Sequence, residues 1–346
     1  MKPPLPIEIH GAGLAGMGLA LLLTRRGIPV RVIDRSTGPQ HRVCGEFMRG
    51  LSPEMIDRFE LSSFLQEAAQ NRKVEWFFQD RSLVRFELPQ PVYSVGRPQL
   101  EGHLLRLCQQ SGVEFLFREK RELKTEGAVI ATGRQKSSNS DWFGFKIHLR
   151  NIFLSSDLEM HLSPHGYVGL SRVEKEWTNV SGIFKANSIP LGESNSLSRP
   201  LHRMQRVLNR MGFSSLSARL ERGEEEEESL KSTSGIVFGL QKNKPNECAI
   251  GDAFAFIPPF SGSGMSMALQ GSLIALEALE RYSKGELTWG ESCRKIRQEL
   301  RRCFYKKLFV AQGFHHLMSS SLFQPSLIQI AKTGFFPVKP ILRGIS

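Results

Sequence analysis

Hydrophobic and polar positions in the first 35 residues change period twice, which predicts a strand, a helix and a second strand. Residues 5–10, LPIEIH, place apolar side chains two apart, as in a short strand. After a glycine turn, residues 15–26 are mostly apolar and predict a helix that closes at Gly27. Residues 28–35, IPVRVIDR, indicate a second buried strand with Asp34 near its end. The pattern therefore predicts a β-α-β unit.

Further along, the pattern predicts a mixture of sheet and helix. Residues 52–95 lack a clear period and indicate strands and loops outside the first sheet, whereas a helix is expected from Pro98. Residues 143–184 alternate between apolar and polar, which predicts antiparallel strands. Residues 199–222 favour a basic helix, and the five glutamates within residues 223–231 favour a solvated loop.

The C-terminal part is predicted to be mostly helical. Residues 247–282 indicate a short strand, a loop and a long helix. Residues 289–318 form a basic amphipathic pattern close to the helical period. The remaining residues, 322–346, are apolar and basic, and two interpretations of this C-terminal segment stay open. It either contacts a membrane surface or packs against the rest of the protein.

Three glycines with the spacing G-x-G-x-x-G, namely Gly11, Gly13 and Gly16, follow the first predicted strand. The first permits a tight turn, the second lets the backbone approach a pyrophosphate, and the third lets the helix pack closely on the strand. The helix N-terminus then faces the phosphates with its partial positive charge. Asp34 ends the second strand, where an acid binds ribose hydroxyls. This context favours dinucleotide binding over a glycine turn without a ligand.

Composition and charge argue against several classes of protein. The hydrophobic share of 40% is that of a folded chain, and 46 basic against 34 acidic residues give a net charge of +12. The basic residues are spread and lack interleaved aromatics, which argues against nucleic acid binding. Five cysteines without C-x-x-C spacing argue against a disulfide framework or a metal site and favour a reducing cytoplasm. Residues 14–23 match a signal-peptide core in length, but two arginines follow them, so export is not expected.

A second dense motif, GDAFAFIPPFSGSGMSMAL, begins at Gly251. Asp252 ends a predicted strand, residues 258–264 form a loop rich in proline and glycine, and a helix is expected from about Met265. The free N–H groups of that helix face the loop. An acid at a strand end and a second helix terminus suit a large cofactor held from two sides.

Together the two motifs resemble the flavoprotein monooxygenase superfamily with the para-hydroxybenzoate hydroxylase fold, which also contains geranylgeranyl reductases and flavin-dependent halogenases. The resemblance implies an α/β fold with a Rossmann-like FAD-binding domain, an inserted antiparallel β-sheet substrate domain and a C-terminal helical segment. The implied FAD-binding domain comprises residues 1–60, 96–140 and 245–285, the substrate-binding domain comprises 61–95 and 141–244, and the helical region comprises 286–346. The W-x-W-x-I-P motif of tryptophan halogenases is absent, which argues against halogenation.

The resemblance also implies which residues hold FAD. The glycine turn and Asp34 are expected at the adenosine diphosphate, Asp252 at the ribityl chain, and residues 258–265 along the isoalloxazine ring. The full set of expected cofactor-binding residues is Gly11, Gly13, Leu14, Ala15, Gly16, Asp34, Arg35, Arg42, Gly45, Arg97, Thr132, Gly133, Gly251, Asp252, Pro259, Gly262, Gly264 and Met265.

Three residues are candidates for catalysis, although the sequence leaves their roles open. Cys44 lies in the loop RVCGEF, which the superfamily places beside the flavin, but it is equally interpreted as a small buried residue. Glu46, with Arg42, is expected to orient substrate or cofactor. His148 has an ordinary pKa near neutrality and so suits acid–base chemistry, but a structurally bonded histidine is the simpler interpretation.

Two departures from the superfamily concern the electron donor and the cofactor sheet. Thr132 precedes Gly133 where family hydroxylases often carry Asp-Gly, which puts the nicotinamide interaction in doubt. Only residues 117–128 separate two predicted strands, so the small sheet expected there is shortened. No second Rossmann unit is visible for NAD(P)H, which fits a donor that visits an open groove or a partner reductase.

The main interpretation is an FAD-dependent monooxygenase that uses NAD(P)H and hydroxylates an apolar aromatic or polyketide-like molecule through a flavin hydroperoxide. The first alternative is a reductase of carbon–carbon double bonds in an isoprenoid or lipid. The second alternative is a flavin-binding protein without turnover. The substrate, the donor and the oligomeric state cannot be predicted from the sequence.

Overall fold

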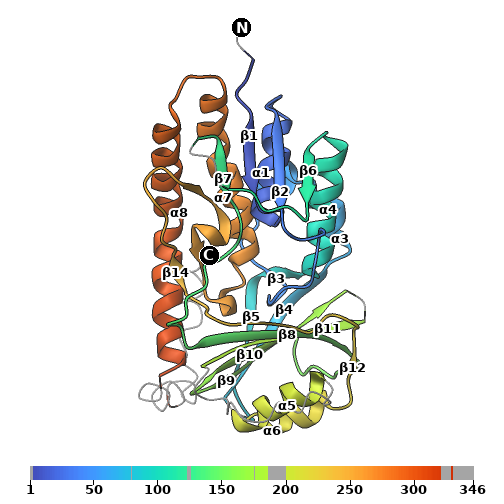
Figure 1. Cartoon of the computed structure of the whole chain (residues 1–346). Helices are drawn as coiled ribbons and strands as arrows, with labels where there is room; N and C mark the ends of the chain where they lie inside the picture. The colour runs from blue at the N-terminus through green and yellow to red at the C-terminus, as the bar shows by residue number, and fades with distance from the viewer. Residues whose placement is uncertain are drawn as a thin grey trace.

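The structure is a computed structural model that describes residues 3–78, 80–122, 126–174, 176–185 and 200–320, and residue 329. One end of the molecule is built on a five-stranded parallel sheet (Figure 1). Its strands, in spatial order, are β15 (Cys248–Ala249), β7 (Ala128–Ile130), β1 (Ile7–His10), β2 (Val30–Asp34) and β6 (Glu114–Phe117). Strands far apart in the chain are therefore neighbours, because β15 joins the edge next to β7.

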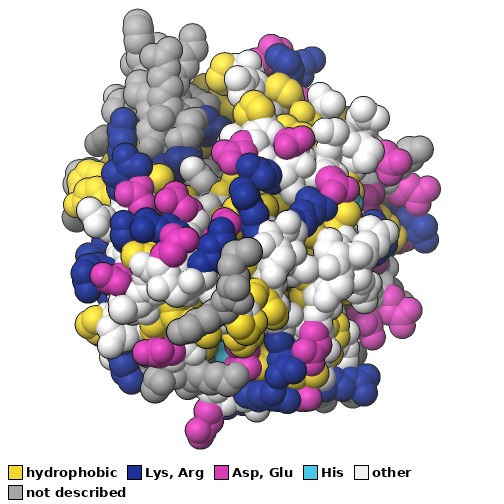
Figure 2. Space-filling view, turned by 90° about the horizontal axis from the view of Figure 1, so that it is seen from above, with side chains coloured by type: hydrophobic (Ala, Val, Ile, Leu, Met, Phe, Trp, Pro, Cys, Tyr) yellow, Lys and Arg dark blue, Asp and Glu magenta, His cyan; other side chains and the backbone are white. Residues whose placement is uncertain are grey.

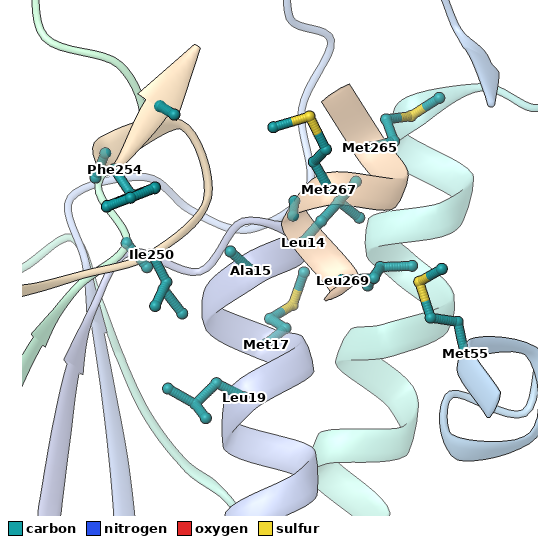
Figure 3. Packing of buried hydrophobic residues seen from close by; sticks show 14 of the residues in the cluster. Leu14, Ala15, Met17, Leu19, Met55, Ile250, Phe254, Met265, Met267 and Leu269 are labelled. Atoms are coloured by element: carbon teal, nitrogen blue, oxygen red, sulfur yellow. The ribbon is translucent and has the colours of Figure 1, made fainter. Parts of the chain in front are cut away.

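Four long helices accompany this sheet, and their ranges are α1 (Leu14–Thr24), α4 (Arg97–Gln110), α7 (Gly264–Ser283) and α8 (Trp289–Met318). Helix α1 contacts both α4 and α7, and α8 packs along α7 (Figure 1). The first turns of α1 and α7 lie side by side, with Leu14 and Met17 of α1 close to Met267 and Leu269 of α7 (Figure 3). The sequence prediction of a helix over residues 289–318 is confirmed.

The other end of the molecule is a nine-stranded sheet covered on one side by two short helices (Figure 1). Its strands are β3 (Phe47–Met48), β4 (Ala69–Phe78), β5 (Arg81–Ser94), β8 (Trp142–Arg150), β9 (Leu158–Ser163), β10 (Gly166–Val173), β11 (Trp177–Lys185), β12 (Glu224–Glu225) and β13 (Lys231–Thr233). The pairing is antiparallel except between β4 and β9, which run parallel and join two distant parts of the chain. Strand β3 belongs to this sheet although it lies in the N-terminal segment.

The two faces of β8 have different environments, as the alternation of its residues predicts. Phe145, Ile147 and Leu149 are buried in an apolar cluster with α5 (Pro200–Arg210) and α6 (Ser214–Leu220). Lys146 and His148, which alternate with them, are also buried, with at most 1% of each residue exposed. Because successive side chains point to opposite faces, both polar residues point away from α5 and α6 and toward His41 and Glu46.

Helix α6 is attached to the sheet through a buried carboxylate. Glu159 on β9 accepts a hydrogen bond from Arg219 Nη1 of α6 at 3.0 Å and contacts Nε2 of His161 at 2.9 Å. Burial opposes ionisation, but the His161 and Arg219 contacts outweigh it and lower the pKa of Glu159 to about 2. The ion pair therefore stabilises this helix on the sheet at neutral pH.

The structure corrects three expectations. Residues 52–95 contain two helices, α2 (Pro53–Arg58) and α3 (Leu61–Gln66), as well as strands, because a six-residue helix is too short to show a period. Residues 199–222 form two helices instead of one, and Gly212 between them has a φ of +81°. The acidic residues 223–231 are not simply a solvated loop, because Glu224 and Glu225 form β12 and Glu226 contacts a buried histidine.

Four short elements precede α7, and their ranges are β14 (Gly239–Leu240), η2 (Gly251–Ala253), β16 (Ala255–Phe256) and η3 (Pro259–Ser261). On the face seen in Figure 2, Lys and Arg side chains are mixed with Asp and Glu. Among the described residues, no helix is long and apolar enough to cross a membrane. The predicted fold class is confirmed by the parallel sheet, the separate antiparallel sheet and the C-terminal helix.

Candidate active site

A cleft that is partly open to solvent lies where the ends of the parallel strands meet the antiparallel sheet. Segments from six parts of the chain form its wall, including both glycine-rich motifs. The lining residues are Gly13, Leu14, Ala15, Asp34, Arg42, Val43, Cys44, Gly45, Phe47, Arg97, Ala131, Thr132, Gly133, Asp252, Phe256, Ile257, Pro259, Gly262, Gly264, Met265 and Ala268. Ligands of open α/β sheets bind at this position, beyond the carboxyl ends of the strands.

The three glycines of the first turn have different surroundings. A Cβ on Gly16 would lie 1.9 Å from the carbonyl oxygen of Gly11, and one on Gly11 would lie 2.3 Å from that of Ala131. Gly11 also has a φ of +115°, which side chains rarely adopt. A Cβ on Gly13 would instead meet nothing closer than Arg97 Nη2 at 3.9 Å. Gly11 and Gly16 thus bring backbone segments together, whereas Gly13 leaves room on the cleft side.

Asp34 fixes the glycine turn to the end of β2. Its carboxylate accepts hydrogen bonds from the backbone N–H of Ala12 at 2.7 Å and of Ser36 at 2.6 Å. Burial opposes ionisation, but these hydrogen bonds outweigh it, so the pKa of Asp34 lies below its usual value. Asp34 therefore presents a carboxylate to the cleft at neutral pH.

Arginines supply positive charge along the cleft. Arg97 is held by a 2.9 Å hydrogen bond from its Nε to the buried Glu101, one turn along α4. Asp252 lies in the field of Arg97, although burial prevails and raises the pKa of Asp252. The buried Nε of Arg42 has no hydrogen-bond partner in the described part of the chain.

These features fit an FAD pyrophosphate. Helix α1 begins at Gly13 without a side-chain cap, so its first N–H groups remain available on the cleft side. The unpartnered Nε of Arg42 is a further donor for an anion, because a buried donor without a partner is costly. The space beside Gly13 lets a phosphate approach the backbone. The cleft thus offers donors and space where the dinucleotide motif requires them.

A second, apolar pocket, partly open to solvent, adjoins the cleft. The two share Val43, Cys44, Gly45, Phe47 and Pro259, which therefore form the partition between them. The other lining residues come from β9, β10, β11 and the end of the 258–262 loop, and they are Met160, Tyr167, Gly169, Ser181, Gly182, Ile183 and Phe260. Among the described residues that line this pocket, the only ionisable side chains are a thiol and a phenol.

The antiparallel sheet holds the loop that forms this partition. Ser171 Oγ donates to the carbonyl oxygen of Gly45 at 3.1 Å, and Asn179 Nδ2 donates to that of Cys44 at 3.0 Å. Lys146 Nζ is 2.8 Å from Nδ1 of His41 and 2.8 Å from Oε1 of Glu46. Lys146 therefore connects both ends of the loop 42–45 from beneath.

Glu46 is the centre of a buried charged cluster. Its side chain is fully buried and accepts hydrogen bonds from Lys146 and from the backbone N–H of Arg97, the latter at 2.9 Å. His148 contacts Glu46 through Nε2 and Glu226 through Nδ1. The side chains of Lys146 and His148 thus face the carboxylates of Glu46 and Glu226 in this cluster.

The electrostatics of this cluster favour an ionised Glu46. Burial opposes its ionisation, but the His148 hydrogen bond and the Lys146 charge outweigh this effect, so the pKa of Glu46 lies below its usual value. Burial, followed by the charge of Lys146, lowers the pKa of His41. A neutral His41 accepts the Lys146 hydrogen bond, which is consistent with the contact to Nδ1.

The structure brings most of the predicted cofactor residues together around the cleft. Gly11, Gly16 and Gly251 are not in its wall: the first two allow close backbone contacts, and Gly251 leaves room for the side chain of Ala15. Arg35 is exposed just after β2. Of the three catalytic candidates, Cys44 lines both the cleft and the pocket. Glu46 and His148 line neither and instead bond to each other beneath the loop.

Sequence reasoning missed several lining residues and the clamp formed by Lys146. The missed cleft residues are Val43, Phe47, Ala131, Phe256, Ile257 and Ala268. Most of them are apolar residues next to predicted ones in the sequence. Extending each predicted motif by a few residues would therefore have included them. The sequence places Lys146 on one face of β8 through its alternation with apolar residues. It does not indicate that Lys146 is buried, because a lysine in a strand usually faces solvent.

Comparisons with known proteins agree with this geometry. Residues 5–141 match the family model described as an FAD binding domain. A geranylgeranyl bacteriochlorophyll reductase-like protein from Thermoplasma acidophilum is 16% identical with a TM-score of 0.73, over 98% of this chain and 95% of that one. A probable FAD-dependent monooxygenase, PqsL, from Pseudomonas aeruginosa is 15% identical with a TM-score of 0.67, over 96% and 99%. The myxobacterial chondrochloren halogenase CndH is 15% identical with a TM-score of 0.72, over 99% and 93%. No curated protein sequence matches this chain.

At these identities, the solved structures establish the fold alone, and the family match over residues 5–141 supports FAD binding. The predicted resemblance is confirmed, since the matched structures include a monooxygenase, a halogenase and a reductase-like protein. Residues 5–141 therefore match an FAD binding domain, and the chain as a whole has the fold of these FAD-dependent proteins.

Proposed function

We propose that this chain is an FAD-dependent monooxygenase that transfers one oxygen atom to a planar, apolar small molecule, with NAD(P)H as the electron donor. The observation that supports it is the apolar pocket, which shares a wall with the cofactor cleft and contains no Asp, Glu, His, Lys or Arg. The substrate would lie in this pocket, and the shared wall would separate it from the cleft that holds the cofactor.

Bound FAD would accept two electrons from the donor and supply reducing power for dioxygen. The chain itself would position and protect the reacting groups. Asp34, Arg42 and Arg97 would hold the ribose and phosphates, and the loop 42–45 would bring its backbone to the flavin edge. The apolar pocket walls would exclude water, which prevents wasteful breakdown of reduced intermediates. No side chain is required as a nucleophile for this reaction.

The alternative is a reductase that delivers a hydride to a carbon–carbon double bond, and one observation favours it. Such a reaction needs a proton donor next to the second carbon. Cys44 and Tyr167 both line the pocket, and burial raises the pKa of each, so the thiol and the phenol keep their protons at neutral pH. Either group is therefore a source of the required proton.

The reaction type is tested by following NADH and NADPH consumption in the FAD-loaded protein, in air and under nitrogen. Small aromatic phenols and an isoprenoid alcohol such as geranylgeraniol serve as probe substrates. A monooxygenase consumes the donor with the phenol only in air, and one atom of ¹⁸O from labelled dioxygen enters the product. Reduction of geranylgeraniol under nitrogen would establish the reductase, and no turnover with any donor and probe would favour a non-catalytic flavin protein.

A Cys44→Ala variant separates the two reactions further. Under the reductase interpretation with Cys44 as proton donor, the variant keeps the rate at which NAD(P)H reduces FAD but loses product formation. Under the monooxygenase proposal, product formation per donor consumed changes little, because no thiol proton is needed. Tyr167→Phe serves as the companion variant, since Tyr167 is the other proton source in the pocket.

A further inference from the structure

Helix α8 carries a surface that the proposed function does not use. This 30-residue helix runs along the side of the molecule next to α7 (Figure 1). Its residues facing α7 and β15 are apolar and buried, as the 3.6-residue period requires. The opposite side, called here the outer face of α8, contains the basic residues Arg294, Lys295, Arg301, Arg302 and Lys306, all of which are exposed.

Two aromatic side chains lie in the middle of this basic face. Tyr305 and Phe309 are 63% and 69% exposed, and their rings stack one helical turn apart with centroids 6.4 Å apart. Half of the large hydrophobic residues found exposed in the described chain are on α8, because Leu317 is 37% exposed as well. Exposed aromatic side chains on a charged helix face are unusual unless another surface covers them.

The spacing of the basic and aromatic residues in the sequence places them on the same face of α8. Successive outer positions Arg294, Arg301, Tyr305 and Phe309 are separated by four or seven residues, which places them on one side of a helix. Arg301, Arg302 and Lys306 flank the aromatic pair. Acidic residues are few here: Glu291 lies at the N-terminal end, and Glu299 pairs with Arg302 at 2.7 Å.

We propose that the outer face of α8 binds the surface of an anionic lipid bilayer. Lysine and arginine side chains near such a surface gain electrostatic attraction, and aromatic rings next to them settle at the level of the lipid head groups. At roughly 1.5 Å per residue, the basic residues from 294 to 306 extend over about 18 Å along the outer face of α8. The inference does not depend on the reaction that the flavin performs.

Sedimentation with lipid vesicles tests this proposal on the full-length, FAD-loaded protein. Vesicles of phosphatidylcholine alone and of phosphatidylcholine with 30% phosphatidylglycerol are compared at 0.05 and 0.5 M NaCl. Binding is expected only to the anionic vesicles and is expected to be lost at high salt, because screening weakens attraction between exposed charges. Equal binding to both vesicle types, or no binding at low salt, would overturn the proposal.

Two variants locate the binding surface. Arg301→Gln with Lys306→Gln is expected to lower the partition coefficient roughly 25-fold, at about fivefold for each charge. Tyr305→Ser with Phe309→Ser is expected to lower it while preserving its salt dependence. The matched control is Phe153→Ser, because Phe153 is 73% exposed but lies on the antiparallel-sheet domain.

All variants must keep the FAD content and unfolding temperature of the unmodified chain, which is expected since the substituted side chains are exposed. If Phe153→Ser weakens vesicle binding as much as the α8 variants do, the face is misassigned. Retention of the unmodified chain by duplex DNA with the same salt dependence, and not by vesicles, would identify a nucleic acid surface instead and would overturn the proposal.

Discussion

Lys146 is expected to be among the residues whose loss is most costly to this fold. Its side chain is fully buried, and its only carboxylate contact in the described chain is Glu46, which is itself fully buried. The change Lys146→Met keeps the length and apolar stem of the side chain but removes the charge and its hydrogen bonds. Glu46 then keeps the contacts to His148 and Arg97 but lacks its lysine, and His41 loses a donor.

The magnitude follows from breaking a buried ion pair by removing one partner. Such changes typically cost about 3–5 kcal/mol, because the remaining charge stays buried after losing one of its compensating partners. With about 2 °C of unfolding temperature per kcal/mol in a chain larger than 250 residues, the expected decrease is roughly 6–10 °C. FAD affinity is expected to fall as well, since Lys146 holds both ends of the loop that forms the cleft wall.

Thermal unfolding followed by circular dichroism, with and without added FAD, measures both effects. Glu46→Gln and the double variant complete a double-mutant cycle. If the cost arises from an uncompensated carboxylate, the double variant is more stable than Lys146→Met alone. A Lys146→Met protein within 1 kcal/mol of the unmodified chain, or additive effects in the cycle, would refute the reasoning. Lys73→Met, at an exposed position on β4, is the control for a lysine change in the same sheet.

Three further predictions concern the cofactor turn and the pH dependence of stability. Gly13→Val is expected to fold but to lose bound FAD absorbance, because a side chain there enters the cleft, while Gly313→Ala, with open space around it, retains FAD. Asp34→Asn is expected to weaken FAD binding at least tenfold by titration, because an amide cannot accept both N–H groups that the carboxylate accepts. Glu159 has a folded pKa of about 2 against an ordinary 4.5, so its stabilisation is complete above about pH 5 and lost as the pH falls to 2. Glu159→Gln should therefore be less stable by roughly 3 kcal/mol in urea unfolding at pH 7, and this difference should shrink as the pH falls from 5 through 2, whereas a constant difference would contradict the reasoning.

The sequence predicts those parts of the fold whose local residue pattern is compatible with only one structure. Gly11 and Gly16 allow backbone contacts that no side chain permits, so their spacing indicates the turn and the helix behind it. The helix over residues 289–318 is long enough for its apolar period to be clear. The six-residue helices α2 and α3 contain too few turns for a period, so their residues do not differ from those of a loop.

The interior charged cluster is the part of the site that the sequence does not reveal. Glu226 is one of five consecutive glutamates, and such a run usually indicates exposure to solvent. It contacts His148 only because β12 pairs with β8 and brings the acidic segment to the sheet edge. Glu46 and Lys146 are a hundred residues apart, so their contact depends on how the two sheets meet. Long-range packing of this kind leaves no local periodicity to detect.

The chain order of the parallel sheet has a consequence for synthesis on the ribosome. The first glycine-rich motif of the cofactor cleft, Gly11–Gly16, is synthesised early. The second part of the cleft, after β15 and at the start of α7, leaves the ribosome about 250 residues later. At roughly 5–20 residues per second, the first motif waits on the order of 10–50 s for its partner strand. During that interval the edge of β7 and the apolar side of α1 have no partner from the C-terminal half. The nascent chain is therefore expected to need shielding from aggregation, and FAD capture should be a late event that follows release of the final helices.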